Sequence, residues 1–310
     1  MKIITLTLNP AFDMHCYVNQ FRPFHENIAD ITSFEAGGKG VNISRALAYN
    51  EIDNLAVIVV GDENSAEFVK LLEKDGMQSS VVETKGRIRE NITLHSGGQD
   101  ETRISFHGFS CDETILQAVE AKVGEVNEDT IVTFTGSLPK GISVDSVKAF
   151  LLKLKEQGAK IVIDSRSFSL SDLTEFKPWL VKPNRDEAEQ YAGRQIYTIV
   201  DGIDVAKQLY ALGIENVVLS LGKDGAVLVA KEGIFLAKTP KIEAVSTIGA
   251  GDSMIAGFIG AYAKKLSIQD CLKTSVAYGT AACMQSGTCP PKKEDIEFIR
   301  KQVTIGNINK

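Results

Sequence analysis

The chain has 310 residues, of which 44% are hydrophobic and 24% are charged, as is typical of a globular protein with a sizeable core. Its net charge is -6 and its lysines and arginines form no long run, which argues against a nucleic-acid partner. No stretch approaches the roughly 18 apolar residues of a membrane helix, and the apolar run in MKIITLTLNP is too short for a signal peptide. We therefore expect no membrane association and a cytoplasmic location.

The five cysteines are an odd number and form no C-x-x-C pair. This pattern favours reduced thiols, mostly buried, over a disulfide framework or a zinc site. The thiols in question are Cys16, Cys111, Cys271, Cys283 and Cys289.

Short runs rich in valine and isoleucine alternate along the chain with amphipathic helical patterns. The expected strands are residues 3–8, 56–60, 131–134, 160–164, 179–181 and 216–221. The expected helices are residues 41–49, 66–74, 144–156, 186–192 and 205–212. Several of the strands are almost continuously apolar, which is typical of a parallel sheet covered by helices on both faces. The pattern predicts an α/β fold, with a doubly wound, mostly parallel sheet flanked by helices in a single domain over residues 1–310.

One region interrupts this alternation. The stretch RENITLHSGGQDETRISFHG alternates apolar and polar residues around a Gly-Gly turn, with Ile92 and Leu94 before the turn and Ile104 and Phe106 after it. This is the pattern of a β-hairpin, and residues 13–35, which lack a helical period, could supply its partner strands. We expect a small β lid, formed by about residues 13–35 and 87–108 and inserted in the α/β core.

The segment AGGKGVN, residues 36–42, places one lysine in a glycine-rich turn at a helix start. It is not a P-loop, because Ser33 stands where that pattern needs glycine and Gly40 stands where it needs serine or threonine. Glycines nevertheless let the backbone approach a ligand, free amides point outward at a helix start, and Lys39 adds a full charge. The segment therefore predicts an anion site.

A second glycine cluster predicts chemistry as well as binding. In VSTIGAGDSMIAGF a strand leads into Gly249, Ala250, Gly251 and Asp252 and then into a helix, so that free amides can surround an anion. A carboxylate would repel that anion, but it suits a general base that accepts the proton of a sugar hydroxyl while the amides stabilise the transferring phosphoryl group. The alternative is that Asp252 only caps its helix.

Other expected strands end in short polar or glycine-containing stretches. These are NPAFD after residues 3–8, TGSLPKG after 131–134, KPNRDEAE after 179–181 and SLGKDG after 216–221. Such positions form the ligand crevice of a doubly wound sheet. The SLGKDG turn could pass close to a nucleotide or be a plain hairpin turn. Asn184 and Glu187 could cap a helix or place polar groups around a hydrated metal ion.

These stretches together resemble the motifs of the PfkB carbohydrate kinases, which have the ribokinase-like fold. In chain order the matching segments are NPAFD, AGGKGVN, TGSLPKG, VKPNRDE, SLGKDG and VSTIGAGDSMIAGF. The match covers nearly the whole chain. Within the family, NPAFD, GRIREN, GSLPKG and PWLVKPN are similar to stretches shared by bacterial 1-phosphofructokinases and tagatose-6-phosphate kinases.

The resemblance implies a phosphotransferase that uses ATP and Mg²⁺ and acts on a ketohexose monophosphate. The first candidate reaction converts fructose 1-phosphate to fructose 1,6-bisphosphate, and the close alternative is tagatose 6-phosphate as acceptor. A more distant alternative is a catalytically inactive sugar-phosphate sensor on the same fold. A dinucleotide-dependent oxidoreductase is disfavoured, because no G-x-G-x-x-G follows the first strand.

The resemblance also implies roles for individual residues. Asp252 corresponds to the catalytic base, and Gly249, Ala250 and Gly251 correspond to its anion hole. The residues expected at the sugar are Asp13, Gly37, Gly38, Lys39, Asn42, Arg89, Asn91 and Ser137, with Lys39 and Arg89 at the phosphate that the substrate already carries. The residues expected at the nucleotide are Lys182, Asn184, Ser220, Gly222, Gly225, Ser246, Ala277 and Cys283. Glu187 is expected at magnesium and its waters, together with Asn184. Lids of this family often pair between subunits, which implies a homodimer formed through the lid.

The sequence departs from the family pattern at three places. Ile88 stands where GxTRxN has threonine, and Thr135 and Arg166 stand where serines are usual. Ile88 and Arg166 could alter the contacts of the sugar or its phosphate, although Arg166 could instead be a surface residue.

Overall fold

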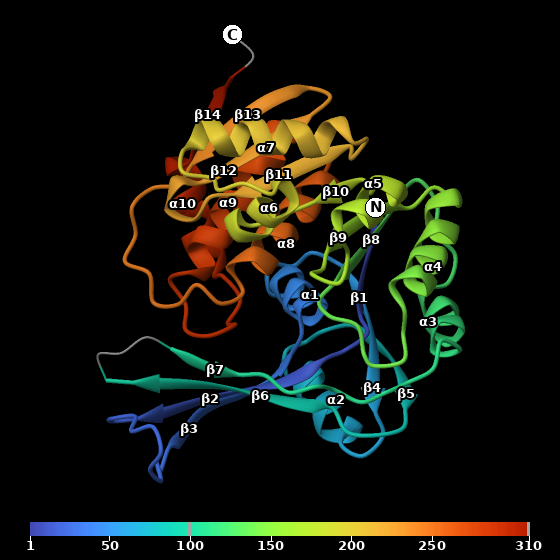
Figure 1. Ribbon diagram of the computed structural model, residues 1–310, viewed down its shortest axis with the longest axis vertical. Coiled ribbons are helices and arrows are strands. Elements are labelled where there is room, and N and C mark those ends of the chain that lie inside the picture. Colours follow the sequence, from blue (N-terminus) through green and yellow to red (C-terminus); the bar gives the residue numbers. More distant parts are fainter. Residues whose placement is uncertain (98–100, 309–310) are drawn as a thin grey trace.

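The computed structural model describes residues 1–97 and 101–308, and it contains two sheets of different size (Figure 1). Within this part of the chain, the larger sheet has ten strands in the order β14-β13-β12-β11-β10-β9-β8-β1-β4-β5. Its strands are β1 (Lys2–Thr7), β4 (Leu55–Gly61), β5 (Ser79–Thr84), β8 (Thr130–Thr135), β9 (Lys160–Asp164), β10 (Leu180–Val181), β11 (Asn216–Ser220), β12 (Ala226–Ala230), β13 (Gly233–Lys238) and β14 (Thr304–Asn307). The strands from β5 to β11 pair in parallel, whereas β12, β13 and β14 continue the sheet antiparallel.

Helices cover both faces of the large sheet. They are α1 (Lys39–Tyr49), α2 (Ser65–Lys74), α3 (Ile115–Val123), α4 (Val144–Glu156), α5 (Leu170–Phe176), α6 (Arg185–Ala192), α7 (Ile199–Ala211), α8 (Ala250–Ala263), α9 (Ile268–Ala282) and α10 (Lys293–Gln302). One buried cluster contains side chains of α2, α3, α4, α5 and α7, and a second contains those of α1, α8, α9 and α10. In β1, β8, β9 and β11 the buried apolar residues alternate between these clusters, and the buried apolar residues of β4 all belong to the first, so the strands are apolar almost throughout.

The smaller sheet has the order β3-β2-β6-β7 and projects from the α/β core (Figure 1). Its strands are β2 (Ala11–Val18), β3 (Asp30–Gly37), β6 (Arg89–Ser96) and β7 (Thr102–Ile104). Strand β6 pairs antiparallel with β7 and parallel with β2, so residues from two distant parts of the sequence form one sheet. We refer to this sheet as the lid. The predicted Gly-Gly turn extends into residues 98–100, which lie outside the described residues.

The structure confirms the predicted α/β fold and most of the strands and helices that the sequence indicated. The strand expected to lead into Gly249 was wrong, because β13 ends at Lys238 and a segment without regular structure connects it to α8. The structure also contains α3, α5, α9, α10, β5, β12, β13 and β14, for which no residue range was predicted above. It also shows that α7 begins at Ile199, earlier than the predicted residue 205, because Thr198 and Asp201 form a capping box at its start. In the described part of the chain, no helix is both long and apolar enough to cross a membrane.

Candidate active site

A cleft of about 1180 Å³ lies where the carboxyl ends of the parallel strands meet the lid. Strands β1, β8, β9, β10 and β11 all run in the same direction, so the loops that follow them gather at one edge of the sheet. The lid strands β2, β6 and β7 contribute Asp13, Arg89, Asn91 and Arg103 to the opposite wall. The first turn of α8 completes the cleft. Its volume is sufficient for two substrates side by side.

Asp252 lies in the first turn of α8, and its side chain is buried and faces the cleft. It is not the cap of this helix, because the N-cap is Gly249 and no side chain caps the helix start. Its carboxylate oxygen Oδ2 instead accepts a hydrogen bond of 2.9 Å from Nδ2 of Asn42. Burial raises the pKa of Asp252 to about 6, although Lys39 and the Asn42 hydrogen bond oppose the rise. A carboxyl group with this pKa is ionised near neutral pH and can still accept a proton.

The start of α8 offers backbone amides to an anion. Gly249 has a φ of 76°, a left-handed conformation that glycine adopts without strain. Gly251 has a different requirement: a Cβ added there would lie 3.1 Å from Nζ of Lys182, so glycine lets this cation approach the helix start. The amides, the helix dipole and the nearby ammonium group all favour negative charge at this point of the cleft.

Asp164, the last residue of β9, lies close to two of the lysines that line the cleft. Lys39 Nζ donates a 2.9 Å hydrogen bond to Asp164 Oδ2, and Lys182 Nζ lies 3.9 Å from Asp164 Oδ1. Burial would raise the pKa of Asp164, but the two lysines outweigh it and the pKa is lowered. Burial would likewise lower the pKa of Lys39, and Asp164 outweighs it in the opposite direction. The charge of Lys39 is therefore compensated by the carboxylate of Asp164.

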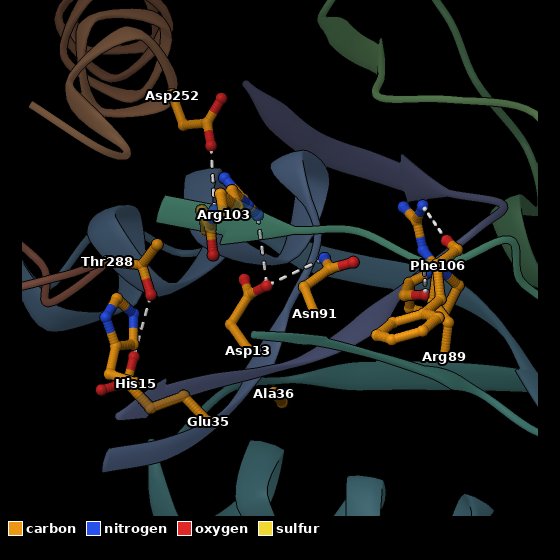
Figure 2. A network of polar contacts seen from close by, with 12 residues as sticks. Asp13, His15, Glu35, Ala36, Arg89, Asn91, Arg103, Phe106, Asp252 and Thr288 are labelled. Atoms are coloured by element: carbon orange, nitrogen blue, oxygen red, sulfur yellow. Dashed lines mark hydrogen bonds and ion pairs between the residues drawn. The ribbon is translucent and has the colours of Figure 1, made fainter. Parts of the chain in front are cut away.

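Asp13, on lid strand β2, is the centre of a second polar group. Asn91 Nδ2 on β6 donates to its Oδ1 at 3.0 Å, and Arg103 Nη2 on β7 lies 3.3 Å from the same oxygen (Figure 2). Gly37 stands directly behind this carboxylate, since a Cβ at Gly37 would lie 2.1 Å from Asp13 Oδ2. The glycine thus explains how β3 can pass so close to Asp13.

Arg89 points from β6 into the same part of the cleft and joins the lid to the core. Its guanidinium donates to the carbonyl oxygens of Asn9 at 3.1 Å, Pro10 at 3.3 Å and Phe106 at 3.1 Å, and to the Ser137 hydroxyl at 3.4 Å. Burial lowers the pKa of Arg89 from its ordinary value, and the neighbouring charge of Arg103 acts in the same direction. The two arginines therefore bring positive charge to one region.

The opposite end of the cleft is formed by the loops after β10 and β11. Asn184 and Glu187 form a capping box at the start of α6: the Asn184 side chain accepts from the Glu187 amide at 2.8 Å, and Glu187 Oε2 accepts from the Asn184 amide at 3.1 Å. Asn184 also forms an isolated parallel bridge with Ser220. The SLGKDG segment is a hairpin turn between β11 and β12 and lines the cleft with Ser220, Gly222 and Gly225. Asn184 and Glu187 therefore cap α6 and also face the cleft, where a hydrated metal ion could bind. The SLGKDG segment is likewise a hairpin turn that also faces the cleft, where a nucleotide could bind.

Most of the residues predicted at the site line this one cleft. They are Asp13, Gly38, Lys39, Asn42, Arg89, Asn91, Ser137, Lys182, Asn184, Glu187, Ser220, Gly222, Gly225, Gly249, Ala250, Gly251, Asp252 and Cys283. Gly37, Ser246 and Ala277 are not among its lining residues. Gly37 backs Asp13, Ser246 accepts a hydrogen bond from the Ile248 amide in its own turn, and Ala277 is buried in the α8–α9 core.

Two of the residues that depart from the family pattern, Ile88 and Arg166, differ in their position relative to the cleft. Ile88 is fully buried in the core, and its amide donates to Asn64, so its side chain does not reach the cleft. Arg166 is largely exposed, lines the cleft and lies 3.2 Å from Glu187 Oε1.

Sequence reasoning did not single out Asp164, Arg103 or Arg45 as site residues. Asp164 is the last residue of a predicted strand, and this position at the ligand crevice was the signal that could have identified it as a site residue. Arg103 meets Asp13 across 90 residues, and Arg45 is a buried arginine next to Asn42, so only the fold reveals their contacts.

Comparison with known proteins agrees with this arrangement. Residues 11–295 match the pfkB family carbohydrate kinases. The chain is 32% identical to a 1-phosphofructokinase of Escherichia coli (strain K12) over 309 residues, covering 99% of each chain, and 30% identical to a 1-phosphofructokinase of Vibrio cholerae over 305 residues, covering 98% of this chain and 96% of that one. The structure superposes on phosphofructokinase-2 from Escherichia coli in complex with substrates and products with a TM-score of 0.91 and 28% identity, covering 97% and 99% of the two chains. The chain therefore belongs to the pfkB family of carbohydrate kinases.

Proposed function

We propose that this kinase transfers the γ-phosphoryl group of ATP to the free primary hydroxyl of a ketohexose monophosphate, with fructose 1-phosphate as the first candidate acceptor and fructose 1,6-bisphosphate as the product. One observation carries the proposal. The buried carboxylate of Asp252 lies beside an uncapped helix start and shares its cleft with the cations Lys39, Arg89 and Arg103. A transferring phosphate and a substrate's own phosphate each need such a region of positive potential.

The two regions suit two different phosphates. The amides of residues 249–251 and the Lys182 ammonium favour the transferring phosphoryl group of ATP, whose charge spreads over its oxygens as it moves. Arg89 and Arg103 extend from the lid, and Lys39 extends from the segment that follows it. Guanidinium groups match the geometry of a terminal phosphate. The acceptor's phosphate is therefore assigned to the lid side, and its free hydroxyl to Asp252.

The reaction follows from this placement. The Asp252 carboxylate accepts the proton of the acceptor hydroxyl as its oxygen attacks the γ-phosphorus, the bond to the bridging oxygen breaks, and ADP leaves with the bonding electrons. The helix-start amides and Lys182 stabilise negative charge on the transferring group. Closure of the lid over the sugar would exclude water, which otherwise competes with the sugar hydroxyl as acceptor.

The cleft also suits a magnesium ion bound together with ATP. Across the described residues, no group of three or more His, Cys, Asp or Glu side chains could hold a metal ion on its own. Mg²⁺ in kinases is usually held by one or two oxygen ligands, several waters and the phosphates of the nucleotide. The carboxylate of Glu187 and the amide oxygen of Asn184 line the cleft and are the groups that would hold the ion or its waters. When bound, the ion neutralises phosphate charge during transfer.

Several polar atoms near the sugar side support a polyhydroxylated ligand. Thr7 Oγ1, Asn91 Oδ1 and Thr135 Oγ1 are buried and find no hydrogen-bond partner among the described residues. All three residues line the cleft. Buried polar groups without partners are costly, so a ligand that presents hydroxyl groups to them would relieve that cost.

The acceptor is identified by initial rates with ATP and Mg²⁺ on four sugars: fructose 1-phosphate, tagatose 6-phosphate, fructose 6-phosphate and unphosphorylated fructose. We expect the highest kcat/KM with fructose 1-phosphate. A preference for tagatose 6-phosphate would retain the mechanism and change the substrate. A preference for plain fructose would exclude the second phosphate site. The absence of turnover with every acceptor would favour the sensor alternative, against which the buried Asp252 argues because a binding protein does not need a carboxylate there.

We also propose that two chains pair through the lid. Its strands, the β2–β3 connection and the segment after β7 expose large apolar side chains, namely Tyr17, Phe24, Ile28, Ile31, Ile104 and Phe106. A group of this kind is typical of an interaction surface, and a second copy of the chain offers the same surface. Sedimentation analysis of Ile31→Lys tests this pairing, with Phe298→Lys as a control at an exposed apolar position on α10. A dimer that persists in Ile31→Lys would exclude this interface.

A further inference from the structure

Asn42 is held from two sides, by groups that define the orientation of its amide. Its Nδ2 donates to Asp252 Oδ2 at 2.9 Å, and its Oδ1 accepts from Arg45 Nη1 at 3.1 Å. Arginine can only donate, and an ionised carboxylate can only accept. If the amide were rotated by half a turn, two donors would meet at Arg45 and two acceptors at Asp252. Arg45 therefore selects the orientation in which Asn42 donates to Asp252.

Arg45 itself is fixed by the protein around it. It follows Asn42 by three residues on α1, so the two side chains share one face of the helix. Its side chain is 5% exposed, its Nε donates to Asp75 Oδ2 at 2.7 Å just after α2, and its Nη2 donates to the carbonyl oxygen of Ala36. Ala36 lies on β3, where the lid strand ends before the glycine-rich segment. A single buried guanidinium thus connects α1, the end of α2 and the root of the lid.

We propose that Arg45 is a positioning residue for phosphoryl transfer: it holds Asn42 so that the amide anchors one oxygen of Asp252 and leaves the other to accept the hydroxyl proton. This inference rests on the proposed function, because it assumes that Asp252 is the general base. It goes beyond that function by giving a role to a residue that does not line the cleft. The order of contacts is Asp75, Arg45, Asn42 and Asp252, with every contact 3.1 Å or shorter.

The charges around Asp252 determine what loss of this anchor would do. Lys39 and Lys182 lower the pKa of Asp252 and Asp164 raises it. We expect these three groups to be unaffected when Arg45 is changed, because the hydrogen bonds of Arg45 go to Asp75, Asn42 and Ala36. The hydrogen bond from Asn42 also lowers this pKa. Without Arg45 the Asn42 amide is free to rotate and the hydrogen bond weakens. The pKa of Asp252 then rises, and more alkaline solution is needed to ionise the base.

The experiment compares pH profiles of kcat/KM in the full-length enzyme. Arg45→Met keeps an apolar stem of similar length and removes all five donors. We expect the acidic limb of its profile, where kcat/KM falls as the pH is lowered, to move to higher pH by about one unit. A shift of this size corresponds to the free energy of one hydrogen bond to a charged group. Arg45→Lys, which keeps the charge but not the fork, should move it less. Arg300→Met is the control, since Arg300 pairs with Asp270 away from the cleft and should leave the limb unchanged. Ionisation of the phosphosugar affects all variants equally, so it does not contribute to the differences between their pH profiles.

A double-mutant cycle separates positioning from a purely structural role. In an Asn42→Ala background, Arg45→Met should produce no further shift of the limb, because Arg45 acts through Asn42. Two outcomes would overturn the inference. The first is a double variant whose shift equals the sum of the two single shifts. The second is an Arg45→Met variant that is normally folded by circular dichroism but whose acidic limb has not moved. If Arg45→Met does not fold, Asp75→Asn takes its place, because it weakens the contact that holds Arg45 and changes a partly exposed residue. The acidic limb of Asp75→Asn should also move to higher pH. An unmoved limb in this variant would equally contradict the inference.

The cycle also distinguishes this inference from the proposed function. A wild-type enzyme that transfers no phosphate to any of the four sugars would contradict the function itself. An active wild-type enzyme whose acidic limb does not respond to Arg45 would contradict only the positioning role.

Discussion

Lys39 lies 2.9 Å from Asp164, although the two residues are 125 positions apart in the chain. The lysine belongs to the glycine-rich segment after the lid, and the aspartate ends a strand of the large sheet. The partly exposed ammonium group of Lys39 therefore has a buried carboxylate partner within the protein. A phosphate that binds here adds to this pair rather than meeting an isolated cation, and Asp164 keeps the lysine pointed into the cleft.

Replacement of Lys39 by alanine should raise KM for the phosphosugar by roughly ten- to hundredfold, because one hydrogen bond between charged groups is lost. KM for ATP should change much less. Rates are measured at pH 8, since Lys39 also lowers the pKa of Asp252 and its loss would otherwise change the ionised fraction of the base. Lys85→Ala, which removes an exposed lysine paired with Asp62, is the matched control. A rise confined to the KM for ATP would place this segment at the nucleotide instead.

Replacement of Asp252 by asparagine should lower kcat by roughly two to four orders of magnitude, the contribution expected of a general base. The affinity for ATP, measured by calorimetry, should be preserved because the amides of residues 249–251 are unchanged. Turnover close to that of the wild type would show that another group accepts the proton.

The raised pKa of Asp252 predicts how activity and stability respond to pH. The base must be ionised, so kcat/KM should decline as pH falls through about 6, after the separate titration of the phosphosugar has been measured by ³¹P NMR and divided out. Stability should show the opposite trend. Burial disfavours the ionised form, so its cost is full above about 6 and disappears below the ordinary pKa of 3.8. Thermal unfolding should therefore show Asp252→Asn to be more stable than the wild type at pH 8, and this advantage should vanish near pH 4.

Replacement of Glu187 by glutamine should raise the Mg²⁺ concentration needed for half-maximal velocity by roughly tenfold. Glutamine can still accept from the N-cap amide of Asn184, so the capping box and the stability of α6 should be retained. Asp201→Asn makes the comparable change in the capping box of α7, outside the cleft, and should leave the Mg²⁺ dependence unchanged. Equal responses in the two variants would indicate that Glu187 acts only as a cap.

Replacement of Arg103 by glutamine should raise KM for the phosphosugar by roughly three- to tenfold. The effect should be smaller than at Lys39, because the Arg103 side chain is 44% exposed and solvent screens its charge. The increase should diminish at high salt, which a titration with potassium chloride would measure. Arg87→Gln is the control, as Arg87 precedes β6, the lid strand that pairs with β7, but does not line the cleft. A KM unaffected at low salt would remove Arg103 from the substrate site.

The sequence predicted those parts of the molecule that depend on local pattern. The parallel strands were recognisable because both faces of each strand are buried, as in the LAVIVVG run of β4. Strand β5, with the sequence SSVVET, has only two central apolar residues and was not assigned. The glycine-rich turns could be located because positive φ angles and helix starts require particular residues near one another in sequence. The contact partners of Lys39, Asp13 and Arg45 could not be predicted, because long-range contacts such as that between Arg103 and Asp13 form only when the chain is folded.

The division of the cleft between lid and core has a consequence for how acceptor preference can change. Asp13, Arg89, Asn91 and Arg103 lie on strands of the small sheet, whereas Asp252 and the groups around the nucleotide belong to the large sheet and its helices. Under the proposed function, most side chains assigned to the sugar and those assigned to phosphoryl transfer thus lie in separable stretches of sequence, with Lys39, Asn42 and Ser137 as exceptions. An exchange of residues 11–37 and 89–104 for those of a relative would be a compact way to give this catalytic core a different sugar, with its use of ATP unaltered.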